Sequence, residues 1–120
     1  MIKVFNITSP NPIHIEARWC DSFFSRLQGF TFRKNILQNE GLVLVEKRDS
    51  RLDTAIHMFF VFTDLSVTWV NSEMTVTDSV IAKAWHPFYA ASKPAQYVIE
   101  TSTELHGYFK KGDKVSFEKI

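Results

Sequence analysis

Hydrophobic and polar residues alternate along much of this chain with a period of two, which is typical of half-buried β-strands. The clearest case is residues 65–70, where three apolar side chains share one face. Turn-forming residues follow at 71–73, and apolar residues return at 74–76 and 80–82. Because a turn of this length joins antiparallel strands, the pattern predicts a central β-hairpin.

Other segments show strand patterns bounded by turn formers: residues 2–7, 13–18, 41–45, 97–100 and 115–118. We expect the first two to pair antiparallel, because two prolines and several turn formers separate them. The near-continuous apolar run at 41–45 favours a strand that is buried on both faces. Residues 46–53 mix both signs of charge without an apolar period, so we expect an exposed loop there.

One segment instead repeats its apolar residues at helical spacing, at Trp19, Phe23, Phe24 and Leu27. Asp21 or Ser22 can cap its start, and Gly29 suits a left-handed C-terminal cap. The sequence predicts a short helix near residues 22–28 that lays this aromatic stripe on the sheet. A second short helix is expected over 104–109. Many short strands with one clear helix predict a mainly β fold, a compact antiparallel barrel or sandwich.

The length and composition support a folded domain and exclude several classes of function. The 120 residues fit a single domain, 1–120, and 45% hydrophobic with 14% aromatic residues argues against disorder. A formal net charge of +1 provides no long-range field that would attract nucleic acid or an anionic membrane. No apolar run approaches the ~18 residues of a membrane span, and no signal peptide is visible, so we expect a cytoplasmic protein.

Cys20 is the single cysteine, which excludes an intramolecular disulfide and a thiolate-rich zinc site. It lies beside Trp19 in the sequence and is expected to be a packed core thiol. The four glycines are too dispersed for a phosphate-binding loop, and no Gly-x-Ser-x-Gly nucleophile motif occurs. The sequence therefore predicts no nucleotide and no cofactor.

Several short motifs occur in a distinctive order along the chain. They are Arg26 to Arg33, which looks like an Arg-x-x-Gly-Leu-Met-x-x-Arg signature, then Gly41-Leu42-Val43-Leu44, Ile56-His57-Met58-Phe59, Tyr97-Val98-Ile99-Glu100 and Gly112-Asp113. Together, over about residues 15–118, they resemble the domain of unknown function 192 family. The resemblance implies a compact, jelly-roll-like β domain with no agreed activity. Ser66 stands where that family commonly carries Asp.

Two histidines are the best candidates for a metal site. His57 and His86 flank the predicted hairpin, so folding could bring their imidazoles together. With Asp53 or Asp64 they would form a ligand set suited to Zn²⁺ or Fe(II). Their spacing matches no recognised ligand motif, and the alternative is that nearby backbone groups satisfy both rings.

A high content of aromatic residues, without a catalytic motif, predicts a non-enzymatic ligand-binding or protein-interaction module. We expect a pocket or apolar patch lined by Phe30, Arg33, His57, Phe59 and Trp85. The expected partner is an unidentified small ligand or a protein, and we expect neither nucleic acid nor membrane to be bound.

Two other functions stay open at this point. The first is a small metal-dependent hydrolase-like enzyme that uses His57, His86 and Asp64. The second is a structural subunit of an oligomer, in which an exposed aromatic face would form the interface. The chain is expected to be a monomer or a small homo-oligomer.

Overall fold

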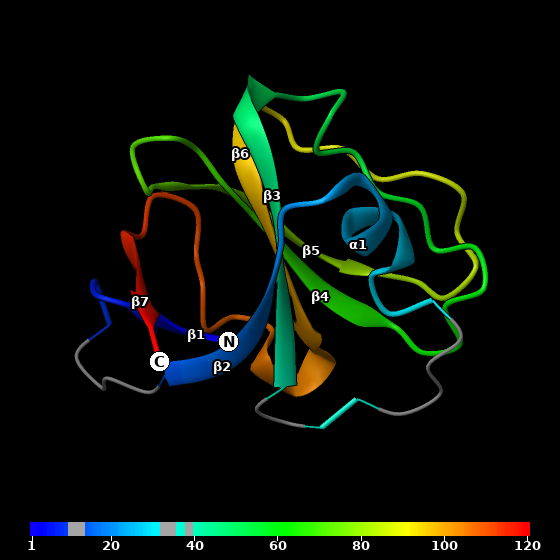
Figure 1. Ribbon diagram of the computed structural model, residues 1–120, viewed down its shortest axis with the longest axis horizontal. Coiled ribbons are helices and arrows are strands. Elements are labelled where there is room, and N and C mark those ends of the chain that lie inside the picture. Colours follow the sequence, from blue (N-terminus) through cyan, green and yellow to red (C-terminus); the bar gives the residue numbers. More distant parts are fainter. Residues whose placement is uncertain (10–13, 32–35, 38–39) are drawn as a thin grey trace.

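The structure is a computed structural model that describes residues 1–9, 14–31, 36–37 and 40–120. These residues form a curled seven-stranded sheet with a short helix lying over it (Figure 1). In chain order the elements are β1 (Ile2–Asn6), β2 (His14–Cys20), α1 (Phe23–Gln28), β3 (Glu40–Ser50), β4 (Leu65–Val70), β5 (Val76–Ala82), β6 (Ala95–Ser102), the 3-10 turn η1 (Thr103–Leu105) and β7 (Val115–Lys119). The prediction of a mainly β fold with one short helix is confirmed.

The strands are ordered β5-β4-β6-β3-β2-β1-β7 across the sheet. β1 and β2 pair antiparallel, as expected, with Val4 opposite Ile15. β2 and β3 pair parallel, which corrects the expectation of a wholly antiparallel sheet. A parallel pair needs a crossover connection, and the segment that contains α1 provides it (Figure 1). The two outer strands approach each other at a bridge between Thr75 and Lys114, so the sheet curls toward a barrel.

Two hydrophobic clusters lie on opposite faces of the sheet, because alternate residues of a strand point to opposite sides. On β3, Leu42 and Leu44 belong to the first cluster and Val43 to the second. All three are buried, so the continuous apolar run marks a doubly covered strand, as predicted. The first cluster also contains Met58 and Trp69. It lies on the face of the sheet that α1 and the loops after β3 and β5 cover (Figure 1).

The predicted central hairpin is confirmed as β4 and β5, which pair antiparallel. Asn71 directs the turn, since its side-chain oxygen accepts the backbone N–H groups of Glu73 and Thr75, both at 3.0 Å. Met74 takes a left-handed φ of 62°, which completes the reversal at a position where a side chain is strained.

The exposed loop expected over residues 46–53 is wrong, because β3 continues to Ser50. Ser50 pairs with Ala95 of β6 beyond an irregularity in the register. Asp49 fixes this extension to the hairpin turn, since its carboxylate accepts both the N–H and the hydroxyl of Ser72, at 2.8 and 2.7 Å. The side chains of Lys47, Arg48 and Asp49 are exposed, but the segment continues as a strand.

The helix predicted near residues 22–28 is present, and Ser22 caps it by accepting the N–H of Ser25 at 3.1 Å. The prediction that its aromatic stripe packs on the sheet is wrong. Phe23, Phe24 and Leu27 are 66%, 79% and 55% exposed. A helix of six residues presents too little surface to bury a stripe, and Phe30, just beyond it, supplies the buried ring instead.

A second helix expected over 104–109 is shorter than predicted and takes the 3-10 form of η1. Ser102 caps it through a hydrogen bond from the N–H of Glu104 at 3.1 Å. Trp19, assigned to the helical stripe, instead belongs to β2, and its ring packs against Tyr97 and Phe117 on the other face of the sheet.

Candidate functional site

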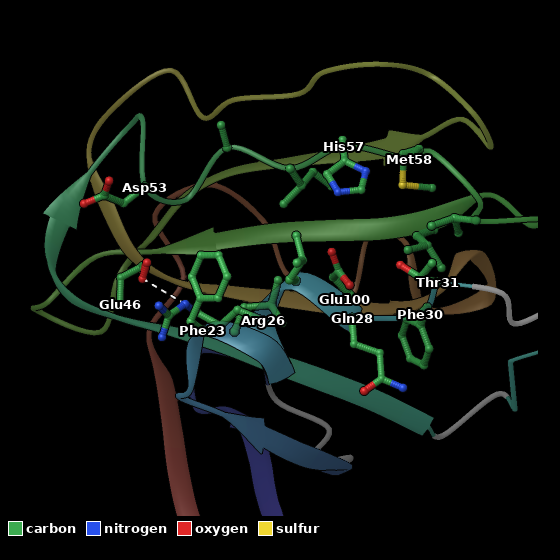
Figure 2. A pocket seen from close by; sticks show the side chains of 17 residues that line it. Phe23, Arg26, Gln28, Phe30, Thr31, Glu46, Asp53, His57, Met58 and Glu100 are labelled. Atoms are coloured by element: carbon green, nitrogen blue, oxygen red, sulfur yellow. Dashed lines mark ion pairs between the residues drawn. The ribbon is translucent and has the colours of Figure 1, made fainter.

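A pocket of about 210 Å³ opens on the face of the sheet that α1 covers (Figure 2). One wall comes from α1 and the turn after it, and the opposite wall comes from the segment 53–61. β3 contributes Leu44 and Glu46, and β4 contributes Leu65. The floor carries Glu100 from β6.

Glu100 lies at an inward-facing position of β6. It is in phase with Val98, which belongs to the hydrophobic cluster on this face. Its direct neighbours across the sheet are Leu42 on β3 and Val67 on β4. The residue is only 5% exposed, so a carboxyl group is placed where the strand pattern calls for an apolar side chain.

The Glu100 carboxyl has no partner within the described part of the chain, where no donor hydrogen-bonds to it and no cation pairs with it. Burial therefore acts unopposed and raises the pKa of Glu100 to about 7. Among the described residues, every fully enclosed side-chain oxygen has a hydrogen-bond partner. Because the Glu100 oxygens have none, they are not fully enclosed and contact the open space of the pocket. Figure 2 shows the group in the middle of the lining residues.

Gly29 lies directly against this carboxyl. It ends α1 with φ 45° and donates its N–H to the carbonyl of Ser25 at 3.2 Å. A Cβ atom built on Gly29 would lie 3.4 Å from Oε1 of Glu100. The helix therefore ends at the pocket floor, with a residue that suits both the left-handed turn and the close approach.

The rim of the pocket is acidic, and Arg26, the guanidinium among the described lining residues, is already engaged. Arg26 pairs with Glu46 at 3.1 Å, the ion pair marked in Figure 2. Its Nη1 also donates to the backbone carbonyls of Asp21 at 2.7 Å and Val45 at 3.2 Å. These bonds hold α1 against β3, so the short helix is docked by polar contacts. Asp53 adds a further carboxylate to the rim.

The wall formed by residues 53–61 is fixed to the rest of the domain by buried hydrogen bonds. The indole N–H of Trp69 donates to the carbonyl of Thr54 at 2.8 Å. Ile56 and Tyr89 exchange two backbone bonds of 2.8 and 2.9 Å, and the N–H of Met58 reaches the carbonyl of His86 at 2.9 Å. The pocket wall is therefore built without a ligand, as small-molecule sites usually are.

The residues predicted to line a binding site are partly brought together. Phe30 and His57 line the pocket. Phe59 and Trp85 are not among its lining residues, and both are exposed. Trp85 contacts the ring of Phe60 at 5.0 Å, in an exposed aromatic group outside the pocket. Arg33, the fifth predicted residue, lies outside the described residues.

The two histidines of the metal hypothesis lie on neighbouring backbone segments, because the N–H of Met58 bonds to the carbonyl of His86. The ring of His57 lies 5.6 Å from that of Phe59, and the ring of His86 lies 4.5 Å from that of Tyr89. Across residues 1–9, 14–31, 36–37 and 40–120, no three His, Cys, Asp or Glu side chains gather as a metal site would require.

Asp64, the third residue of that hypothesis, is engaged elsewhere. Its carboxylate accepts the backbone N–H of Ala84 at 2.8 Å and lies 3.4 Å from Nζ of Lys83. The bond from Ala84, together with the contact to Lys83, lowers the pKa of Asp64. Cys20 is buried as predicted, and burial raises the pKa of its thiol.

Sequence reasoning missed Glu100, although a signal for it was present. The strand predicted at 97–100 contains Val98 and Glu100 two residues apart, hence on the same face. An acidic residue in phase with the core side of a strand is unusual enough to single out. Glu100 entered the sequence analysis only as the end of a motif.

Fold and pocket together define a small, curled mixed-sheet domain with a buried carboxyl on the floor of a pocket that has both apolar and acidic lining residues. The DUF192 family model, described as "Uncharacterized ACR", matches residues 5–117. The chain belongs to this family, which confirms the resemblance seen in the sequence.

The relatives of this chain include proteins of Thermococcus and Pyrococcus species that carry the name UPF0127. A UPF0127 protein of Thermococcus kodakarensis is 36% identical over 97 residues, which are 81% of this chain and 60% of that protein. A UPF0127 protein of Pyrococcus furiosus is 32% identical over 97 residues, 81% of this chain and 80% of the relative. The chain thus spans only 60% of the length of the first of these relatives.

A solved structure of a protein of unknown function from Novosphingobium aromaticivorans shares the fold, with a TM-score of 0.80 at 17% identity. The match covers 96% of this chain and 82% of the other. In the part of the chain that is described, no helix is long and apolar enough to cross a membrane.

Proposed function

We propose that this domain binds a small ligand in the pocket above Glu100. The unpartnered carboxyl on the pocket floor carries the proposal. A buried polar group without a partner is costly, and folded proteins rarely leave one in place. A ligand that donates a hydrogen bond to Glu100 would remove this cost, so the pocket is complementary to such a molecule.

The size and lining of the pocket also support a small ligand. Ligand sites are typically apolar with a few placed polar groups, and sites for drug-sized molecules have volumes of roughly 300–1,000 Å³. At about 210 Å³ this pocket is smaller. An apolar cavity of roughly 150 Å³ can hold benzene. The pocket therefore suits a molecule with one ring or a short alkyl chain.

Nuclear magnetic resonance of uniformly ¹⁵N-labelled protein tests the proposal. The protein would be titrated with small cationic, neutral and anionic fragments, each carrying one ring. We expect at least one class to shift the amide signals of Gly29, Ala55 and Met58, which line the pocket. Ala55→Phe, which fills the pocket from the wall opposite α1, should abolish these shifts while the thermal unfolding transition stays cooperative.

Two results would overturn the proposal. In the first, no fragment of any charge class shifts the pocket amides at millimolar concentration. In the second, the shifts gather around the exposed rings of Phe60 and Trp85 and persist in Ala55→Phe. That result would place binding on the aromatic group outside the pocket.

A further inference from the structure

We infer that the ligand is a small organic cation, in which an ammonium or amidinium group on a compact apolar body contacts Glu100. This inference rests on the proposed function and names the ligand class for the same pocket. Three features of the pocket support this inference. They are the charges of the lining residues, the position of the Glu100 carboxyl at the bottom, and the apolar walls above it.

The charges around the pocket favour a cation. Among the described lining residues, Glu46, Asp53 and Glu100 contribute three carboxyl groups, against the single guanidinium of Arg26. Arg26 is already paired with Glu46 and bonded to two backbone carbonyls, so it has little capacity left for a ligand. An anion would meet the carboxyl groups of Asp53 and Glu100, whereas a cation would supply the charge that these two groups lack.

The position of Glu100 selects a ligand with a polar end and an apolar remainder. The carboxyl lies at the bottom, flanked across the sheet by Leu42 and Val67. Above it the walls present Ile56, Met58 and other buried apolar side chains. A charged N–H group bonded to an unpartnered carboxylate makes the strong, charge-assisted kind of hydrogen bond, and the apolar walls would enclose the rest of the molecule.

Binding of a cation should depend on pH, since the cation pairs with the ionised carboxylate. The titratable or charged groups that line the pocket together with Glu100 are Arg26 from α1, Glu46 from β3, and Asp53 and His57 from the facing wall. The thiol of Cys20 on β2 also interacts electrostatically with Glu100. Burial raises the pKa of Glu100 to about 7. The affinity for an amine that stays protonated should therefore rise roughly tenfold from pH 6 to pH 8. His57→Gln should show the same rise.

The test compares three probes of nearly equal shape, namely benzylamine, benzyl alcohol and benzoate, by calorimetric or resonance titration at pH 8. We expect benzylamine to bind at least tenfold more tightly than either of the others. Glu100→Gln keeps the shape of the side chain but not its charge, and should weaken benzylamine binding by roughly 10- to 100-fold, the range for a hydrogen bond to a charged group. Glu118→Gln removes an exposed carboxyl on β7 and should bind benzylamine like the wild type.

Failure of this inference differs from failure of the proposed function. If benzyl alcohol or benzoate binds the pocket as tightly as benzylamine, or if Glu100→Gln binds benzylamine undiminished, the ligand class is wrong and the pocket remains a binding site. A benzylamine affinity that is flat from pH 6 to pH 8 would also overturn the assignment to Glu100. If none of the three probes shifts the pocket amides, both this inference and the proposed function fail for ligands of this size.

Discussion

Replacing Glu100 by glutamine removes the titrating carboxyl and keeps nearly the same side-chain shape on the pocket floor. The pKa of Glu100 rises from 4.5 to about 7 on folding, because the group is buried without a partner. Between these two values the folded protein holds a proton that the unfolded chain has released. The free energy of unfolding must therefore fall as pH rises through this interval.

The size of the effect follows from the shift in pKa. A difference of about 2.5 units, at about 1.4 kcal/mol for each unit, amounts to about 3 kcal/mol. The contribution is fully present below pH 4.5, declines from there to pH 7, and is lost above about pH 8. For a domain of 120 residues, about 3 kcal/mol corresponds to roughly 10 °C in Tm.

Urea unfolding at several values from pH 4.5 to pH 8 measures this contribution. Other carboxyl groups also make stability depend on pH, so the informative quantity is the difference between Glu100→Gln and the wild type. We expect this difference to move in favour of the variant by about 3 kcal/mol from the lowest pH to the highest. Glu118→Gln, an exposed carboxyl on β7, should follow the wild-type curve.

A constant difference between Glu100→Gln and the wild type over this range would refute the reasoning. It would show that the carboxyl has the same pKa in the folded and unfolded chains. A variant that loses stability relative to the wild type as pH rises would be a stronger contradiction, since it would require a partner that stabilises the ionised form in the folded protein.

Three further substitutions test the elements that build the pocket. Gly29→Ala puts a methyl group 3.4 Å from the Glu100 carboxyl, at a residue whose φ is +45°. Urea unfolding should show that the free energy of unfolding falls by roughly 1–3 kcal/mol. A variant as stable as the wild type would contradict the expected strain. Trp69→Phe leaves the buried carbonyl of Thr54 without its donor, which should cost roughly 1–3 kcal/mol in the same assay; a smaller loss would mean that water replaces the indole. Ser22→Ala removes the cap of α1 and should lower the free energy of unfolding by roughly 1 kcal/mol. Amide exchange in the helix should therefore accelerate, and unchanged exchange would contradict a role for the cap.

Local patterns were sufficient for the elements that depend on neighbouring residues. The hairpin of β4 and β5, the cap at Ser22 and the end of α1 at Gly29 are all legible in the sequence, because turn and cap chemistry acts over a few residues. The parallel pairing of β2 and β3 is not legible in this way. It depends on which strands meet across the whole sheet, and no residue pattern within either strand specifies it.

The charged end of β3 shows why an exposed strand can be mistaken for a loop. Its side chains are solvated, so their sequence carries no alternation. What keeps the segment extended is the pairing of Ser50 with Ala95 and the bonds from Ser72 to Asp49, both formed with residues more than twenty positions away. The sequence of β3 alone contains neither partner.

The candidate site was predicted in part for a similar reason. Phe30 and His57 stand out in the sequence by residue type, and both line the pocket. Phe59 and Trp85 stand out for the same reason, but both are exposed and neither lines the pocket. An aromatic side chain can serve a core, a pocket or a surface, so residue type alone does not separate these roles. Glu100 is distinguished by its position in a strand, which residue type does not reveal.

Glu100 lowers the stability of the folded domain, and this is the strongest argument that it serves a function. A loss of about 3 kcal/mol above pH 7 is a large share of the roughly 5–15 kcal/mol that usually holds a domain together. Its neighbours Leu42 and Val67 would be matched better by an apolar side chain, and no donor among the described residues uses the carboxyl. Departures from local rules of this kind are expected at functional sites. A cation bound at Glu100 would recover the lost free energy only where the carboxylate is ionised, so ligand-induced stabilisation should be larger at pH 8 than at pH 5.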